Sequence, residues 1–227
     1  MGQAKPGERR MNPLIPVTFV ASYERSGVLA TCVRRVERKA VTMWPYMLCA
    51  AMWIGFVFPW LMSSIRKGRA YSIYAECGIG LCLTLVILGL FSWYQNPEEI
   101  VVSQTLQVIG NILLFTAIAL AIFTLSTLKA KGKPRKGLEE TRFLVKSTIF
   151  GVIRHPLYLA LALWAVSQIL AIQSILSLIF GGVAIFCFWM ASVREDQFNL
   201  TKFGDSYREY LKKAPRWNFV KSFRKRF

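Results

Sequence analysis

Histidine is the scarcest reactive residue type in this chain of 227 residues, which contains only His155. A metal site built on paired histidines is therefore excluded. The five cysteines show no C-x-x-C spacing and mostly stand within apolar stretches, where a thiol packs as a small hydrophobic group. No G-x-G-x-x-G sequence follows a strand pattern, so a Rossmann nucleotide site is absent as well.

Acidic residues are also few, and charges of either sign are missing from long runs. The chain has 12 acidic and 29 basic residues, yet 54% of it is hydrophobic. Uncharged stretches cover 41–65, 100–128 and 156–193, and 71–94 contains only Glu76. About 20 apolar residues cross a bilayer as a helix, so 156–193 is long enough for a tight hairpin. The sequence predicts an all-α integral membrane protein with five transmembrane helices in a lipid bilayer.

The placement of basic residues predicts the orientation. They gather at 66–69, in the linker at 129–137 and after Val193, whereas the loop at 95–99 carries two acids and no base. The positive-inside rule puts the three basic regions in the cytoplasm, and with them the C-terminus. Five spans then place the N-terminus outside, against the preference of the basic residues between 34 and 39, so its side stays open.

Five segments follow from these patterns. They are a basic N-terminal extension (1–40), three transmembrane helices (41–128), a basic cytoplasmic linker (129–151), the hairpin (152–193) and a cytoplasmic C-terminal segment (194–227). In the last segment apolar residues recur at three- and four-residue steps from Leu200 to Leu211. This spacing predicts an amphipathic helix on the membrane surface, kinked at Gly204 and ended by Pro215.

A helical hairpin brings its two charged ends together. The group Arg154, His155 and Tyr158 is expected to approach the group Arg194, Glu195 and Asp196. Such a cluster can bind a small zwitterionic or anionic ligand. It can equally be an interfacial ion pair between Arg154 and Glu195 that only fixes the hairpin.

Two stretches resemble a known family. "IRHPLYLA" and, about 40 residues later, "REDQFNLTKFGDSYREYLKKAPRW" are similar to the isoprenylcysteine carboxyl methyltransferases and their bacterial and archaeal relatives. The resemblance covers roughly 142–217. Its matching residues are Arg154, His155, Tyr158, Glu195, Asp196, Phe203, Gly204, Tyr207, Tyr210, Pro215 and Arg216. The chain departs from the family at 148–150, where Gly-Pro-Tyr is usual, and at Asp196, where a second Glu is common.

This resemblance implies an S-adenosyl-L-methionine-dependent methyltransferase with a lipophilic or amphiphilic acceptor. An isoprenylcysteine-like carboxylate is favoured, with a phospholipid amine or a small thiol as the alternatives, and no nucleic acid is involved. The cofactor-binding residues implied are His155, Tyr158, Glu195, Asp196 and Tyr207. The catalytic residues implied are Arg154, His155, Arg194 and Arg216.

Two other interpretations compete with methyl transfer. Membrane sterol reductases that use NADPH have a similar Arg-His-x-Asn-Tyr motif, but Leu157 stands here in place of the Asn. A non-catalytic membrane module would need its charges only paired or solvated. A catalyst, by contrast, needs Arg154, His155 and Glu195 to face one shared cavity.

Overall fold

The computed structural model of the chain describes residues 43–95, 103–133 and 143–217, and these ranges hold helices and their connections without a strand. The chain divides into two units, 1–44 and 45–227, and the second contains the helix bundle. Four helices are long and apolar enough to cross a membrane, and a fifth apolar helix is shorter. The predicted all-α membrane fold is confirmed. The N-terminal extension and most of the acidic loop lie outside the described residues.

The first two spans form an antiparallel pair. The first runs from Met43 to Arg66 and includes a π-helical turn, η1 (Trp53–Val57), ahead of α2 (Phe58–Arg66). A tight turn with Gly68 at a φ of 63° leads into α3 (Ala70–Gln95). The indole N–H of Trp53 donates to the Thr84 hydroxyl at 2.9 Å and links the pair within its apolar part.

Helix α4 (Gln104–Gly132) extends one turn beyond the predicted end of its span at position 128. Lys129 and Lys131 lie in that last turn, where cations interact favourably with the helix dipole. The helix stops at Lys133, whose φ of 43° is left-handed. The first two lysines of the predicted linker are therefore part of α4, which ends where Lys133 adopts the left-handed conformation.

The predicted hairpin is present as α5 (Pro156–Ile172) and α6 (Ile175–Phe203). Gln173 turns the chain with a φ of 50°, and its side chain bonds the backbone N–H and C=O of Ser103 at 2.9 and 2.8 Å. Ser174 and Ser177 then form a capping box that starts α6. Because neither proline nor glycine occurs from 183 to 203, α6 continues past Val193 and carries the charged residues on the same helix as the span.

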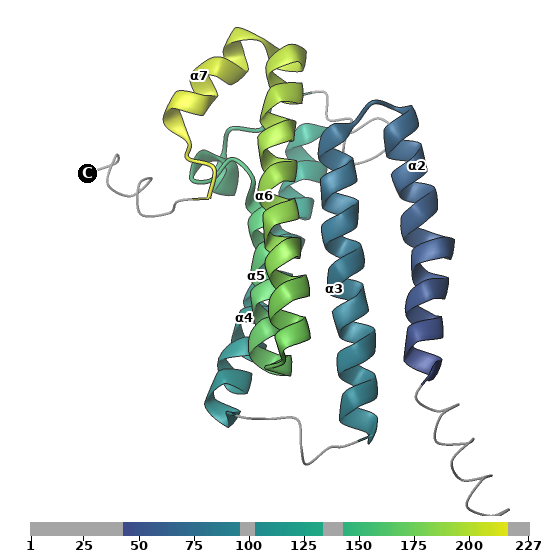
Figure 1. Cartoon of the computed structure of the whole chain (residues 1–227). Coiled ribbons are helices and arrows are strands. Elements are labelled where there is room, and N and C mark those ends of the chain that lie inside the picture. Colours follow the sequence, from purple (N-terminus) through teal and green to yellow (C-terminus); the bar gives the residue numbers. More distant parts are fainter. Residues whose placement is uncertain (1–42, 96–102, 134–142, 218–227) are drawn as a thin grey trace, which may run out of the picture. The chain divides into compact units, whose positions relative to one another are not determined.

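Small residues set the packing of the bundle, in which α4 packs on α5, α3 packs on α6, and α5 packs on α6 (Figure 1). A Cβ on Gly110 of α4 would lie 2.9 Å from the Ser167 carbonyl of α5, and one on Gly78 of α3 would lie 2.6 Å from the Phe188 ring. Close approach of this kind is typical of helices in membranes. The outward faces carry exposed residues such as Phe115 and Phe186, as expected of surfaces that meet lipid.

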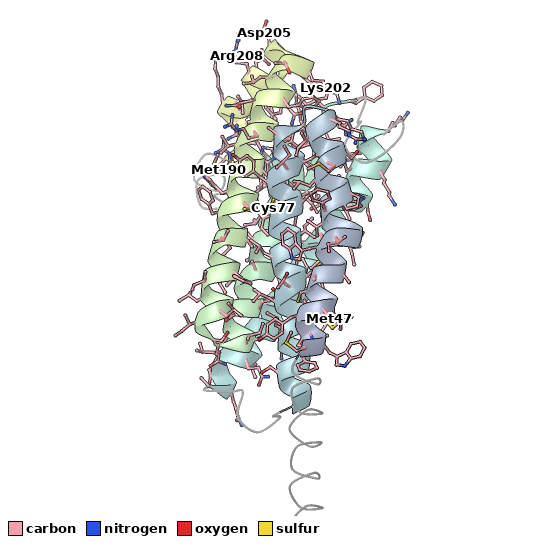
Figure 2. All side chains as sticks on the ribbon, turned by 45° about the vertical axis from the view of Figure 1, so that its right-hand side comes forward. Met47, Cys77, Met190, Lys202, Asp205 and Arg208 are labelled. Atoms are coloured by element: carbon pink, nitrogen blue, oxygen red, sulfur yellow. The ribbon has the colours of Figure 1, made fainter. Side chains whose placement is uncertain are left out.

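Among the described residues, the segments rich in Lys and Arg lie at one end of the bundle, which also holds α7 (Asp205–Lys213). Figure 2 shows Lys202, Asp205 and Arg208 at this end and Met47 towards the other. The α2–α3 turn and the C-terminal end of α4 lie at the same end (Figure 1). The sequence predicted that these basic segments lie on the same side of the membrane, and their position at one end of the bundle agrees with this. That this side is the cytoplasm stays a prediction.

Helix α7 begins after a break at Gly204, whose φ is 56°, and ends before Pro215, as predicted. Its aromatic residues do not face a membrane surface. Tyr207 and Tyr210 are buried against Leu144, Leu200 and other apolar side chains of the protein itself. The apolar face of the predicted amphipathic helix is thus covered by the rest of the chain, and its place on the membrane surface stays a prediction.

Candidate functional site

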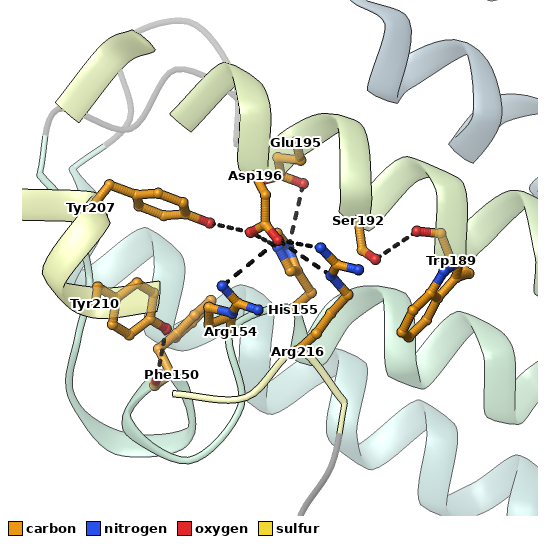
Figure 3. Close-up of polar contacts among 10 residues, drawn as sticks. All are labelled: Phe150, Arg154, His155, Trp189, Ser192, Glu195, Asp196, Tyr207, Tyr210 and Arg216. Atoms are coloured by element: carbon orange, nitrogen blue, oxygen red, sulfur yellow. Dashed lines mark hydrogen bonds and ion pairs between the residues drawn. The ribbon is translucent and has the colours of Figure 1, made fainter. Parts of the chain in front are cut away.

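Asp196 of α6 is the centre of a buried polar cluster where the hairpin ends meet (Figure 3). Its Oδ1 accepts hydrogen bonds from His155 Nε2 at 2.7 Å and from the Tyr207 hydroxyl at 2.6 Å. Its Oδ2 accepts two from Arg216, at 2.7 and 3.2 Å, and lies 3.7 Å from Arg154 Nη1. Two guanidinium groups and two further donors hold this carboxylate in its ionised form.

The local sequence explains how the helix ends reach each other. Pro156 occupies the first turn of α5, where its missing N–H is not needed, and His155 takes the cap position. Helix α6 runs back antiparallel and delivers Asp196 to the same level, 41 residues later. The predicted approach of the two charged groups is confirmed for Arg154, His155, Glu195 and Asp196, although the arginine pairs with Asp196 and not with Glu195.

A short segment after α7 crosses the hairpin base and completes the cluster. The Pro215 carbonyl accepts a hydrogen bond from the Arg154 backbone N–H at 3.0 Å. The guanidinium of Arg216 lies 4.9 Å from the ring centre of Trp189, a cation–π contact, and Trp217 meets the same ring edge-on. Asp196, Arg216 and this segment therefore fix one another in place.

The imidazole of His155 lies between two carboxylates. Because an ionised Asp196 can only accept, Nε2 of His155 carries the hydrogen that it donates. The other nitrogen, Nδ1, is 3.8 Å from Oε2 of Glu195, which is too long for a hydrogen bond. The side chain of His155 is 4% exposed, whereas that of Glu195 is 31% exposed.

Arg154, His155 and Glu195 line one cavity of about 400 Å³. Tyr158 and Tyr207 also line it, whereas Asp196 and Arg216 do not. A catalytic or binding site needs these charged side chains to face one cavity, whereas a purely structural cluster needs them only to pair with one another. Among the described residues, the Arg154 Nε atom is buried without a hydrogen-bond partner, so this guanidinium has a donor to spare.

The far wall of the cavity comes from helices that the sequence motifs did not include. Ser64 of α2 donates a hydrogen bond to Glu76 of α3, and Lys67 and Arg69 stand at the turn between these helices. Glu76 was visible in the sequence as the one charge within an apolar stretch. Such residues usually face a protein interior or cavity, and this signal could have placed it in the site.

The two tyrosines of α7 are held as neutral phenols. Burial, reinforced by the negative charge of Asp196, raises the pKa of Tyr207 above its ordinary value. Burial likewise raises the pKa of Tyr210, although the positive charge of Arg154 opposes this shift. Tyr210 donates to the Phe150 carbonyl and anchors the segment that precedes α5 (Figure 3).

Two further predicted site residues differ in their placement. Arg194 lies away from the cavity, whereas Tyr158 forms part of its wall. Arg194 is exposed and points to Gln197, at 3.3 Å, so it belongs to neither the cluster nor the cavity. Tyr158 is buried in the core between the helices, with its ring 5.8 Å from that of His155. No three His, Cys, Asp or Glu residues of the described ranges stand together as metal ligands.

Comparison with known proteins identifies a family for this chain. No curated protein and no solved structure matches the chain. Residues 59–219 match the family described as NnrU protein, which covers α2 to α7 and the whole of the polar cluster. It is a family of membrane proteins, in agreement with the fold, and the likeness to isoprenylcysteine carboxyl methyltransferases stays a prediction from motifs. The chain belongs to the NnrU protein family.

Proposed function

We propose that the protein is an S-adenosylmethionine-dependent membrane methyltransferase acting on a lipophilic acceptor. The observation that supports this most is the single cavity onto which Arg154, His155 and Glu195 all open. Its volume of about 400 Å³ falls in the range of small-molecule sites, about 300–1,000 Å³. Charged groups line it at one end of a bundle whose apolar side chains continue into the bilayer.

The residues present suit the chemical groups of S-adenosylmethionine. Arg154 can bind the carboxylate of the cofactor with its spare donor. Arg194 points to Gln197, and Arg216 is bonded to Asp196, so neither is assigned this role. The partly exposed carboxylate of Glu195 can accept hydrogen bonds from an ammonium or from ribose hydroxyls. The ring of Tyr158 supplies an aromatic wall next to His155.

Asp196, Tyr207 and Arg216 act indirectly in this assignment. Their hydrogen-bonding atoms are already used within the cluster, and two of the three residues do not line the cavity. We therefore assign them to positioning His155 and the segment after α7, not to contact with the cofactor. Tyr207 alone also presents part of its surface to the cavity.

S-adenosylmethionine supplies an activated methyl group, whose transfer needs alignment with the acceptor and a site that excludes water. The cavity has an apolar wall that includes Ile79 and Leu161 beside the charged residues. Such a wall suits the tail of a lipophilic acceptor. The motif resemblance favours an isoprenylcysteine-like carboxylate, ahead of a phospholipid amine or a small thiol.

Binding of S-adenosylmethionine to the purified full-length protein in nanodiscs tests the proposal. We expect micromolar binding by calorimetry, weakened at least tenfold in Glu195→Ala and in Arg154→Ala. Arg194→Ala is the matched control, since it removes an arginine of the same helix end that faces away from the cavity. Absence of binding in the wild type would refute the methyltransferase assignment, and the cluster would then be a structural clamp in a non-catalytic membrane module.

A further inference from the structure

We propose that His155 and Asp196 form a general-base pair and that the methyl acceptor is an amine bound between His155 and Glu195. This inference rests on the proposed function and names the acceptor class that the same site selects. It departs from the carboxylate acceptor that the motif resemblance favours.

The first step concerns the free nitrogen of the imidazole. Asp196 takes the hydrogen on Nε2 at 2.7 Å, which leaves Nδ1 with a lone pair in the neutral ring. Nδ1 faces Glu195, a residue that lines the cavity, whereas Asp196 does not line it. The ring therefore presents a proton-accepting atom on its cavity side.

The second step concerns the charge of the partner. Asp196 is contacted by Arg216, Arg154 and Tyr207, so its negative charge is compensated and its oxygens are occupied. It can orient the imidazole and stabilise the imidazolium that forms, without taking the proton itself. This division of roles is the one that an Asp–His pair has in nucleophilic enzymes.

The third step concerns Glu195, whose Oε2 would determine which acceptor binds while its other oxygen, Oε1, stays available to the cofactor. Its Oε2 is 3.8 Å from Nδ1, and an atom about 2.8 Å from each is at hydrogen-bond distance from both. An ammonium or amine nitrogen has several hydrogens and can bond the two groups at once. A carboxylate or thiolate placed there would meet the negative charge of Glu195 and would be repelled.

The reaction balances with these groups alone and a methyl donor. Nδ1 of His155 accepts one proton from the bound ammonium, and the nitrogen lone pair so released forms the new N–C bond. The donor's C–S bond breaks with its electron pair left on sulfur, which becomes a neutral thioether. The imidazolium then returns its proton to water. A carboxylate acceptor is already ionised, so its methylation would not require His155 as a base.

Because His155 is the only histidine of the chain, every imidazole signal in an NMR spectrum comes from this residue and needs no further assignment. The experiment uses ¹⁵N-histidine-labelled full chain, purified without a histidine tag, in nanodiscs of phosphatidylcholine. We expect the neutral ring to show the tautomer with hydrogen on Nε2. We expect a mixture of tautomers in Asp196→Asn, while Arg194→Gln should match the wild type. A ring that carries its hydrogen on Nδ1 in the wild type would overturn the proposal.

The acceptor class is tested by changing only the head group. Phosphatidylethanolamine has N–H donors and phosphatidylcholine has none, so adding the former should shift the Nδ1 signal towards the hydrogen-bonded position. The shift should shrink at least threefold in Glu195→Gln, and N-acetyl-S-farnesylcysteine, which keeps the carboxylate but has its amine blocked, should not produce it. No shift with phosphatidylethanolamine, or an equal shift with N-acetyl-S-farnesylcysteine, would overturn the amine assignment.

This measurement needs no methyl donor, so the two proposals can fail separately. Binding of S-adenosylmethionine without an Nδ1 response to the amine lipid would remove only the acceptor assignment. An Nδ1 response without binding of S-adenosylmethionine would remove the methyltransferase assignment and leave an amine-binding site.

Discussion

Replacing Asp196 by asparagine tests the cluster most directly, because the two side chains have nearly the same shape. The change removes the charge that Arg216 and Arg154 face and turns one accepting oxygen into a donor. If the amide nitrogen takes the place of Oδ1, it faces the donors of His155 and Tyr207. If it takes the place of Oδ2, it faces the donors of Arg216. Neither orientation of the amide satisfies all the donors.

The magnitude follows from burial and from the number of bonds. The side chain of Asp196 is 8% exposed and accepts four hydrogen bonds. Removing one partner of a buried ion pair costs about 3–5 kcal/mol, because the other charge is left without its counter-ion. At about 2–4 °C per kcal/mol for a chain of this size, we expect the apparent Tm to fall by roughly 6–20 °C.

The assay is thermal unfolding in a fixed detergent, followed by the loss of the monodisperse peak in size-exclusion chromatography. Asp205→Asn is the matched control, since its carboxylate is 91% exposed and its ion-pair partner, Arg208, is exposed as well. It should change the apparent Tm by less than about 2 °C. Equal shifts in Asp196→Asn and in the control would refute the reasoning that this cluster holds the bundle end together.

The remaining predictions concern α7 and the helix contacts. Tyr207→Phe removes a buried bond to the charged Asp196 and should cost about 1.5–3 kcal/mol in the free energy of unfolding. The raised pKa of Tyr207 means that the unfolded chain releases its proton near pH 10 while the folded chain keeps it. The contribution of Tyr207 to stability should therefore be constant below pH 10 and fall above it, so the apparent Tm measured from pH 7 to 11 should fall less steeply above pH 10 in Tyr207→Phe. Gly78→Ala should cost about 1–3 kcal/mol by overpacking against Phe188, whereas Gly182→Ala, with open space around it, should be neutral or stabilising in the same unfolding assay.

The hairpin and the contact between its ends could be predicted from the sequence because both depend on local signals. The apolar stretch was too long for one helix, and antiparallel helices bring residues at fixed spacing to one level. His155 and Asp196 met as expected for this reason. The turn needed only Gln173 and a serine cap, which local sequence supplies.

The directions of neighbouring charges could not be predicted from spacing. Successive residues of an α-helix point about 100° apart. Arg194, Glu195 and Asp196 therefore point to solvent, to the cavity and to the hairpin interior respectively. Which of the three faces inward depends on how α6 packs, and that is decided by contacts distant in sequence.

The far cavity wall and the covered face of α7 were missed for a related reason. The motifs lie in the second half of the chain, so nothing local connects them with Glu76 or Ser64 of the first helices. The periodicity of α7 indicated an apolar face without indicating what covers it. Leu144 and the end of α6 cover it, and only the assembled bundle shows this.

The segment after α7 has a consequence for biosynthesis. Asp196 is translated 20 residues before Arg216, so the nascent hairpin leaves the translocon with a carboxylate that still lacks the arginine hydrogen-bonded to it in the finished protein. The helices can insert at that moment, but the cavity cannot take its final form until Pro215 and Arg216 have crossed the hairpin base. A chain stopped by a nonsense codon after Lys213 would keep the helices from α2 to α7 but would leave Asp196 without its bond to Arg216. Such a product would be inserted in the membrane but would be incompletely folded at one end. We expect membrane quality-control proteases to degrade it.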